Sequence, residues 1–215
     1  MMTLEQIKTF LTSSKSSDRR KGAKEIGKQK LIELGESLFN AYLKESQNTK
    51  TWETQVEMIL ALGLIDYKQA LPIISKIVLL NTPHSMISYA SAQTYIRLKR
   101  KSLEDAKPII ELLKIGSLSI VDGALNPLGY DKMIPSTDEI KTLIRLAWDL
   151  HKHKDRIGKE YAYCDPRYGL AASCAGWDKQ LTSDFLNHCL ETANGDTSLL
   201  NVAKNALKQK YIKLR

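Results

Sequence analysis

Apolar side chains recur at intervals of three and four residues through most of the chain, in stretches separated by short polar turns. This spacing is typical of amphipathic α-helices. The stretch from Ile77 to Ile96 has no charged residue, but the polar residues 81–85 interrupt it. We therefore expect the end of one helix, a turn and the next helix there, and no membrane span. The same reasoning predicts an opening helix near Leu4 to Leu11.

The pattern repeats when the sequence is shifted by 36 residues. Several apolar and capping positions then coincide: Leu60 with Ile96, Leu62 with Leu98, Asp66 with Ser102, Gln69 with Asp105, Ala70 with Ala106, and Pro72 with Pro108. Asp and Ser are good N-caps, and Gln or Asp three residues later supports the first helical turn. Asp66 and Ser102 are therefore predicted to start equivalent helices.

Weaker copies flank these two units. Ser136 with Glu139 repeats the cap, a unit from Asp18 to Glu45 precedes, and Asp165-Pro166 begins another. A basic terminal helix over residues 196–215 is expected to cap the stack. The count is eleven or twelve helices in five to six pairs, forming one domain over residues 1–215.

The residue types in the repeat are informative in addition to its length. The run Ala61-Leu62-Gly63, followed by Asp66 and then Ala70-Leu71-Pro72-Ile73, resembles units of the HEAT-repeat family. That resemblance implies an all-α fold, a right-handed α-α superhelix whose second helices line a concave binding face. Paired helices at this period need neighbouring pairs to bury their apolar faces. The regular Asp/Arg ladder of many family units is missing here.

Composition agrees with an all-helical chain, because Val, a residue that favours strands, occurs only four times. The net charge is +8, and the last fifteen residues carry five basic residues and no acid. A mildly basic body with a basic end suits an acidic protein partner. Nucleic acid is the alternative partner. Its binding would need the basic clusters to converge, namely Arg19-Arg20-Lys21, Lys99-Arg100-Lys101, Lys152 to Lys159 and the C-terminal tail.

Catalytic and metal signatures are missing from the sequence. There is no G-x-S-x-G, Walker or Rossmann motif. His151 and His153 lie in a basic helix end near Cys164, so we predict no metal and no cofactor. Cys174 and Cys189 fall on apolar helix faces and are expected to be buried thiols.

One enzyme class remains as an alternative. Alkylpurine DNA glycosylases are HEAT-like and search for damaged bases with tryptophans and an acid. Trp148 and Trp177 are each followed by an aspartate, and Trp52 is the third tryptophan. That family's Trp-Trp-Asp run has no match here.

The preferred function is therefore non-catalytic protein binding, as an adaptor or inhibitor, including a bacterial toxin-immunity protein. Polar side chains on the second helices of the pairs are predicted to contact the partner: Tyr89, Gln93, Arg97, Asp122, Asn126, Arg167 and Tyr168. An insertion over 151–165 is expected to form a basic and aromatic lip beside them. We expect a cytoplasmic protein that is monomeric when unbound.

Overall fold

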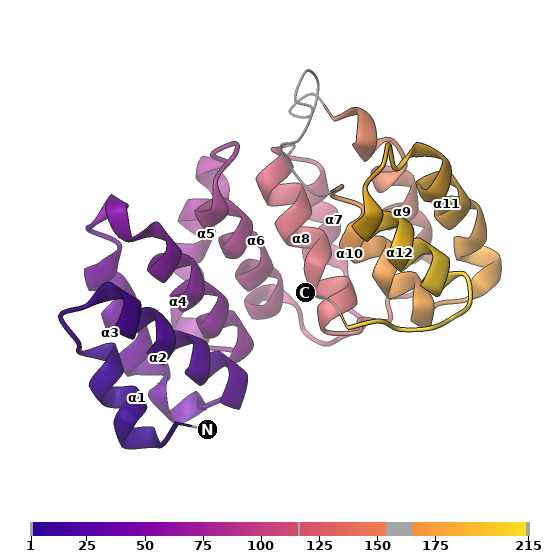
Figure 1. The fold of residues 1–215 in the computed structure, drawn as a ribbon. Coiled ribbons are helices and arrows are strands. Elements are labelled where there is room, and N and C mark those ends of the chain that lie inside the picture. The colour runs from indigo at the N-terminus through magenta and orange to yellow at the C-terminus, as the bar shows by residue number, and fades with distance from the viewer. Residues whose placement is uncertain (1, 116, 154–164, 214–215) are drawn as a thin grey trace. The chain divides into compact units, whose positions relative to one another are not determined.

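The computed structural model describes residues 2–115, 117–153 and 165–213. In these ranges the chain is helical and contains no strand (Figure 1). Its contacts divide it into two compact units, residues 1–99 and 100–215. The all-α class predicted from the sequence is confirmed, whereas the single-domain organisation stays a prediction.

The first unit is a stack of three helix pairs in two rows (Figure 1). Helices α2, α4 and α6 pack against one another in one row, and α1, α3 and α5 pack against their outer side. The bounds are α1 Leu4–Leu11, α2 Ser16–Gln29, α3 Gly35–Glu45, α4 Trp52–Leu64, α5 Leu71–Leu80 and α6 Met86–Lys99. The charge-free stretch thus contains the end of α5, a turn and most of α6, as the sequence predicted.

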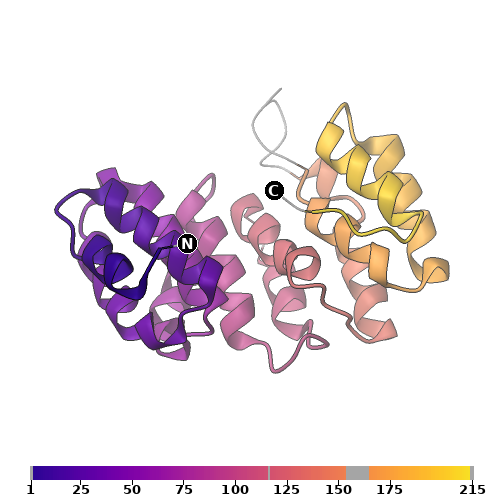
Figure 2. The same cartoon turned by 60° about the horizontal axis from the view of Figure 1, so that its bottom comes forward.

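The second unit repeats this arrangement (Figure 2). Helices α8, α10 and α12 form one row, and α7, α9 and α11 form the other. The bounds are α7 Lys107–Leu113, α8 Leu118–Tyr130, α9 Thr137–Ala147, α10 Tyr168–Ser173, α11 Lys179–Thr192 and α12 Thr197–Ala206. The terminal helix packs on α10 and α11 through its apolar face, so it caps this unit, but it ends at Ala206, earlier than predicted.

The 36-residue register is correct, but two of the predicted caps are wrong. Helices α5 and α7 begin 36 residues apart, and each has its proline in the first turn, where the missing N–H costs nothing. Asp66 lies instead in a left-handed turn (φ 53°) that ends α4, and its carboxylate pairs with Lys68. Ala106 occupies the cap position that Ser102 was expected to fill. In both repeats the helix therefore starts later than the cap pattern indicated.

Other local signals are confirmed. The Ser136 hydroxyl accepts from the Glu139 N–H, and the Glu139 carboxylate accepts from the Ser136 N–H, which is a complete capping box. Asp165 does not cap α10 directly. The cap position is Arg167, directly before the helix begins at Tyr168, and the Asp165 carboxylate accepts from the Arg167 N–H.

Two glycines allow neighbouring helices of a row to approach closely. A Cβ atom at Gly63 of α4 would lie 2.8 Å from Thr94 Oγ1 of α6. A Cβ atom at Gly169 of α10 would lie 2.6 Å from the carbonyl oxygen of Leu125 in α8. The row spacing therefore depends on having no side chain at these positions.

Candidate functional site

The predicted contact residues of the first unit lie on α6 and are largely buried. Gln93 is 5 % exposed and Arg97 is 7 % exposed. Tyr89 is half-buried. The sequence placed these side chains on an open face, but the structure leaves only Tyr89 with substantial exposure.

The predicted residues of α8 interact with each other. The Asn126 amide donates to the backbone carbonyl of Asp122 at 2.8 Å and to its carboxylate at 3.0 Å. Asn126 is buried and Asp122 is half-buried. The amide of Asn126 therefore makes its hydrogen bonds within α8. Asp122 is the more exposed residue of this pair.

Arg167 corrects the prediction most clearly, because it is fully buried. Its guanidinium donates to both carboxylate oxygens of Asp165, at 2.9 and 2.8 Å, and to the Thr192 hydroxyl at 2.7 Å. A side chain held in this way joins the turn before α10 to the end of α11 and does not reach a partner. Tyr168, the next residue, is half-buried.

Five residues of the described basic clusters are paired with acids. Arg19 pairs with Glu45, Arg20 with Glu53, Lys21 with Asp18, Arg100 with Asp131, and Lys152 with Asp149. A phosphate-binding track needs basic groups that are not already neutralised. These five residues are therefore less available to a phosphate backbone. Residues 154–159 of the third cluster, and most of the predicted lip, lie outside the described residues.

The two tryptophans of the second unit, Trp148 and Trp177, have different surroundings. Trp177 is buried, and its indole N–H donates to the carbonyl of Met133 at 2.8 Å. Asp178 beside it caps α11 by accepting from the Gln180 N–H. Trp52 is exposed on the other unit. Trp148 and the following Asp149 both line one hollow.

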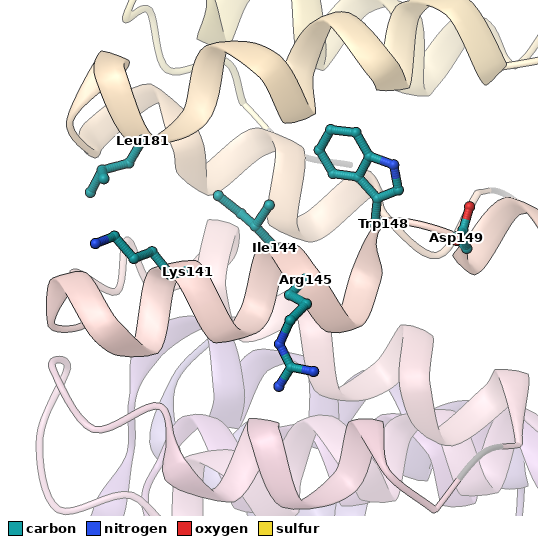
Figure 3. A pocket seen from close by; sticks show the side chains of 6 residues that line it. All are labelled: Lys141, Ile144, Arg145, Trp148, Asp149 and Leu181. Carbon is teal, nitrogen blue, oxygen red and sulfur yellow. The ribbon is translucent and has the colours of Figure 1, made fainter.

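That hollow is the first candidate site, and it lies between α9 and α11 (Figure 3). It is an open depression of about 460 Å³, lined by Lys141, Ile144, Arg145, Trp148, Asp149 and Leu181. The first four face it because they recur at helical spacing along α9, beside the core residues Ile140, Leu143 and Ala147. Figure 3 shows Trp148 directed toward α11 and Leu181 descending from the start of α11.

This surface was not among the predicted contacts, because those lie on the second helices of the pairs, whereas α9 is the first helix of its pair. The available signal was the helical spacing of Lys141, Ile144, Arg145 and Trp148 (i, i+3, i+4, i+7), which places them on one face of α9 beside its core stripe.

Trp148 is held in place by stacking. Its ring lies 4.4 Å from that of His188 of α11, with an interplanar angle of 7°, and 6.3 Å from the core residue Phe185. The edge of the hollow continues into His151 and Asp149. Burial lowers the pKa of His151, and the positive charge of Arg167 lowers it further. The His151 ring is therefore neutral at neutral pH.

A second hollow, of about 730 Å³, lies in the first unit, and Arg19 and Glu45 are among its lining residues. Burial alone would raise the pKa of Glu45, but hydrogen bonds from Arg19, Thr51 and Ser16 outweigh it, so the pKa is lowered. The Ser16 hydroxyl donates to Glu45 at 2.9 Å. Because this carboxylate is already satisfied within the protein, the hollow is a weaker candidate than the one beside Trp148.

The thiols of Cys174 and Cys189 are buried, as predicted. Burial raises the pKa of Cys189 to about 12 and that of Cys174 well above its usual range. Both therefore remain protonated and are poor nucleophiles.

None of the helices in the described part of the chain is long and apolar enough to cross a bilayer. Comparisons with protein-family models, with curated proteins and with solved structures find no significant match.

Proposed function

We propose that this protein is a non-catalytic binding module that acts as an adaptor or inhibitor by holding another protein. The observation that carries the proposal is the hollow between α9 and α11 (Figure 3). Trp and Arg are the residue types most enriched among side chains that dominate binding energy, and this hollow presents Trp148 and Arg145 together. Ile144 and Leu181 supply the apolar surface beside them.

The rigid position of Trp148 also supports partner binding at the hollow. Ordering a long side chain on binding costs about 0.5–1.5 kcal/mol. Trp148 is already ordered in the free protein by its stacking on His188 and its contact with Phe185. It therefore loses little conformational freedom when a partner covers it.

Two basic side chains at the hollow support an acidic partner. Lys141 and Arg145 are exposed, and in the part of the chain that the structure describes neither pairs with a carboxylate. A partner with an apolar anchor flanked by Asp or Glu side chains would meet both requirements. The net charge of +8 favours encounter with such an acidic protein.

This surface replaces most of the contact set expected on the concave face, of which Tyr89, Asp122 and Tyr168 keep partial exposure. The narrower role, inhibition of a toxin by an immunity protein, is one form of this binding. We also propose that the protein is cytoplasmic and that it is monomeric when unbound.

The test is affinity capture of partners from the native host with the tagged protein, with and without nuclease. Arg145→Glu reverses the charge of the hollow without touching the core, and Lys76→Glu on α5 is the matched control, because Lys76 is exposed on the other unit. We expect one stoichiometric protein that survives nuclease. Its affinity should fall at least about tenfold with Arg145→Glu, which is about 1.4 kcal/mol, and stay unchanged with Lys76→Glu.

Two outcomes would contradict the proposal. Equal capture by both charge variants would remove the hollow as the contact site. Recovery of nucleic acid that salt releases steeply would favour the nucleic-acid class instead.

A further inference from the structure

Three side chains with metal-binding groups converge at the end of α9, although they come from separate parts of the sequence. Asp149 and His151 belong to the turn that follows α9, and His188 belongs to α11. One potential ligand atom from each lies within 4.8 Å of the other two. The sequence showed only His151-x-His153, because nothing in it indicates that His188 is near.

The His188 ring is oriented by its neighbours. Its Nε2 lies 3.1 Å from the backbone carbonyl oxygen of Trp148, and its face stacks on the Trp148 ring. A carbonyl oxygen only accepts, so Nε2 donates to it, and Nδ1 is the ring nitrogen left for an ion. A histidine that donates one ring N–H to a carbonyl and keeps the other nitrogen for an ion is the usual arrangement of a metal ligand.

His151 has a nitrogen that lacks a partner. Its Nδ1 is buried and makes no hydrogen bond with any described residue. The ring lies 5.3 Å from the His188 ring and nearly edge-on to it, at 68°. Buried polar atoms are nearly always satisfied, so a bare nitrogen beside a second histidine requires an explanation. A bound cation would provide one.

We propose that Asp149, His151 and His188 bind one zinc ion. Two imidazole nitrogens and one carboxylate oxygen form a ligand set that zinc uses when one coordination position stays open. Zinc lies about 2.0–2.2 Å from such ligands, so tetrahedral ligand atoms are about 3.4 Å apart. The three side chains therefore close slightly around the ion.

Asp149 is able to make this movement. Its carboxylate pairs with Lys152 at 2.9 Å, but both side chains are more than half exposed, at 62 % and 68 %. Exposed ion pairs of this kind contribute little and exchange readily. The ion replaces Lys152 as the partner of the carboxylate.

The zinc site adjoins the hollow, because Asp149 lines both. The ion would link the end of α9 to α11. Its fourth coordination position would be taken by water or by a donor group of another molecule. This inference does not depend on the proposed function. A failure to bind zinc leaves the role of Arg145 and Trp148 in partner binding unaffected.

The experiment is isothermal titration of the metal-stripped full-length protein with ZnCl2, and the same titration with CoCl2 followed by visible absorption. We expect one ion per chain. Loss of a second-shell partner lowers metal affinity by about 10–100-fold, so His151→Ala, which removes a ligand, should lower it by at least about 100-fold. Asp149→Asn should also weaken binding, and it leaves the packing of the helices unchanged because Asp149 is exposed.

The matched control is His84→Ala, which removes an exposed histidine from the other unit and should bind zinc as the parent does. His188→Ala removes the third ligand and is interpreted only if circular dichroism shows a folded chain. The proposal is wrong if the parent binds no zinc at micromolar concentration, or if His151→Ala and Asp149→Asn bind it with the parent's affinity.

Discussion

Removing the Arg167 side chain should strongly destabilise the second unit. The guanidinium is 0 % exposed and its partner Asp165 is 1 % exposed. Arg167→Ala deletes two hydrogen bonds to the Asp165 carboxylate and one to the Thr192 hydroxyl. It also leaves a buried carboxylate without its counter-ion. Breaking a buried pair by removing one partner costs about 3–5 kcal/mol, and we expect a loss in this range.

The measurement is urea denaturation followed by tryptophan fluorescence. Trp148 and Trp177 lie in the second unit, so the exposed Trp52 is replaced by phenylalanine in the parent and in every variant. The signal then reports the second unit alone. The loss should appear as a lower midpoint with an unchanged slope.

A double-mutant cycle identifies the cause. Arg167→Met combined with Asp165→Asn removes both charges, so the double variant should lose at least about 1 kcal/mol less than the sum of the two single variants. A loss below about 1 kcal/mol for Arg167→Ala, or simple additivity in the cycle, would refute the assignment of Arg167 as a buried structural cation.

The remaining predictions concern the core, a buried acid and the thiols. Leu62→Asp should unfold the first unit, because it places an unpaired charge at a fully buried position, and a cooperative melt near that of the parent would contradict the repeat register. The pKa of Glu45 is lowered by folding, so the stability it contributes is present above pH 4.5 and is lost as the pH falls through its folded value; acid titration of Glu45→Gln by circular dichroism should show a shallower decline. In a Cys164→Ser variant the two remaining thiols should not react with a thiol reagent at pH 8 until the protein unfolds, and labelling at the rate of a free thiol would show that Cys189 is accessible.

The repeat could be predicted from the sequence because each helix carries its own apolar stripe. Leu62 and Leu98 occupy equivalent positions one period apart and are both buried. Pro72 and Pro108 indicate the starts of α5 and α7 because proline is best tolerated in the first turn of a helix. Caps were harder to predict, because Asp66 serves equally well in a left-handed turn that ends the preceding helix.

The candidate site could be predicted only in part, because a polar side chain on a helix does not reveal whether a neighbour covers it. Arginine usually lies at the surface of a protein. Arg167 is instead buried by Asp165 and by the end of α11, which lies 25 residues away in the sequence. In the same way, His188 reaches His151 only because α9 and α11 pack side by side. Local periodicity therefore determined the helices, their pairing and their buried stripes. Burial of polar groups, and the meeting of Trp148, His151 and His188, depend on long-range packing, and only the tertiary structure decided them.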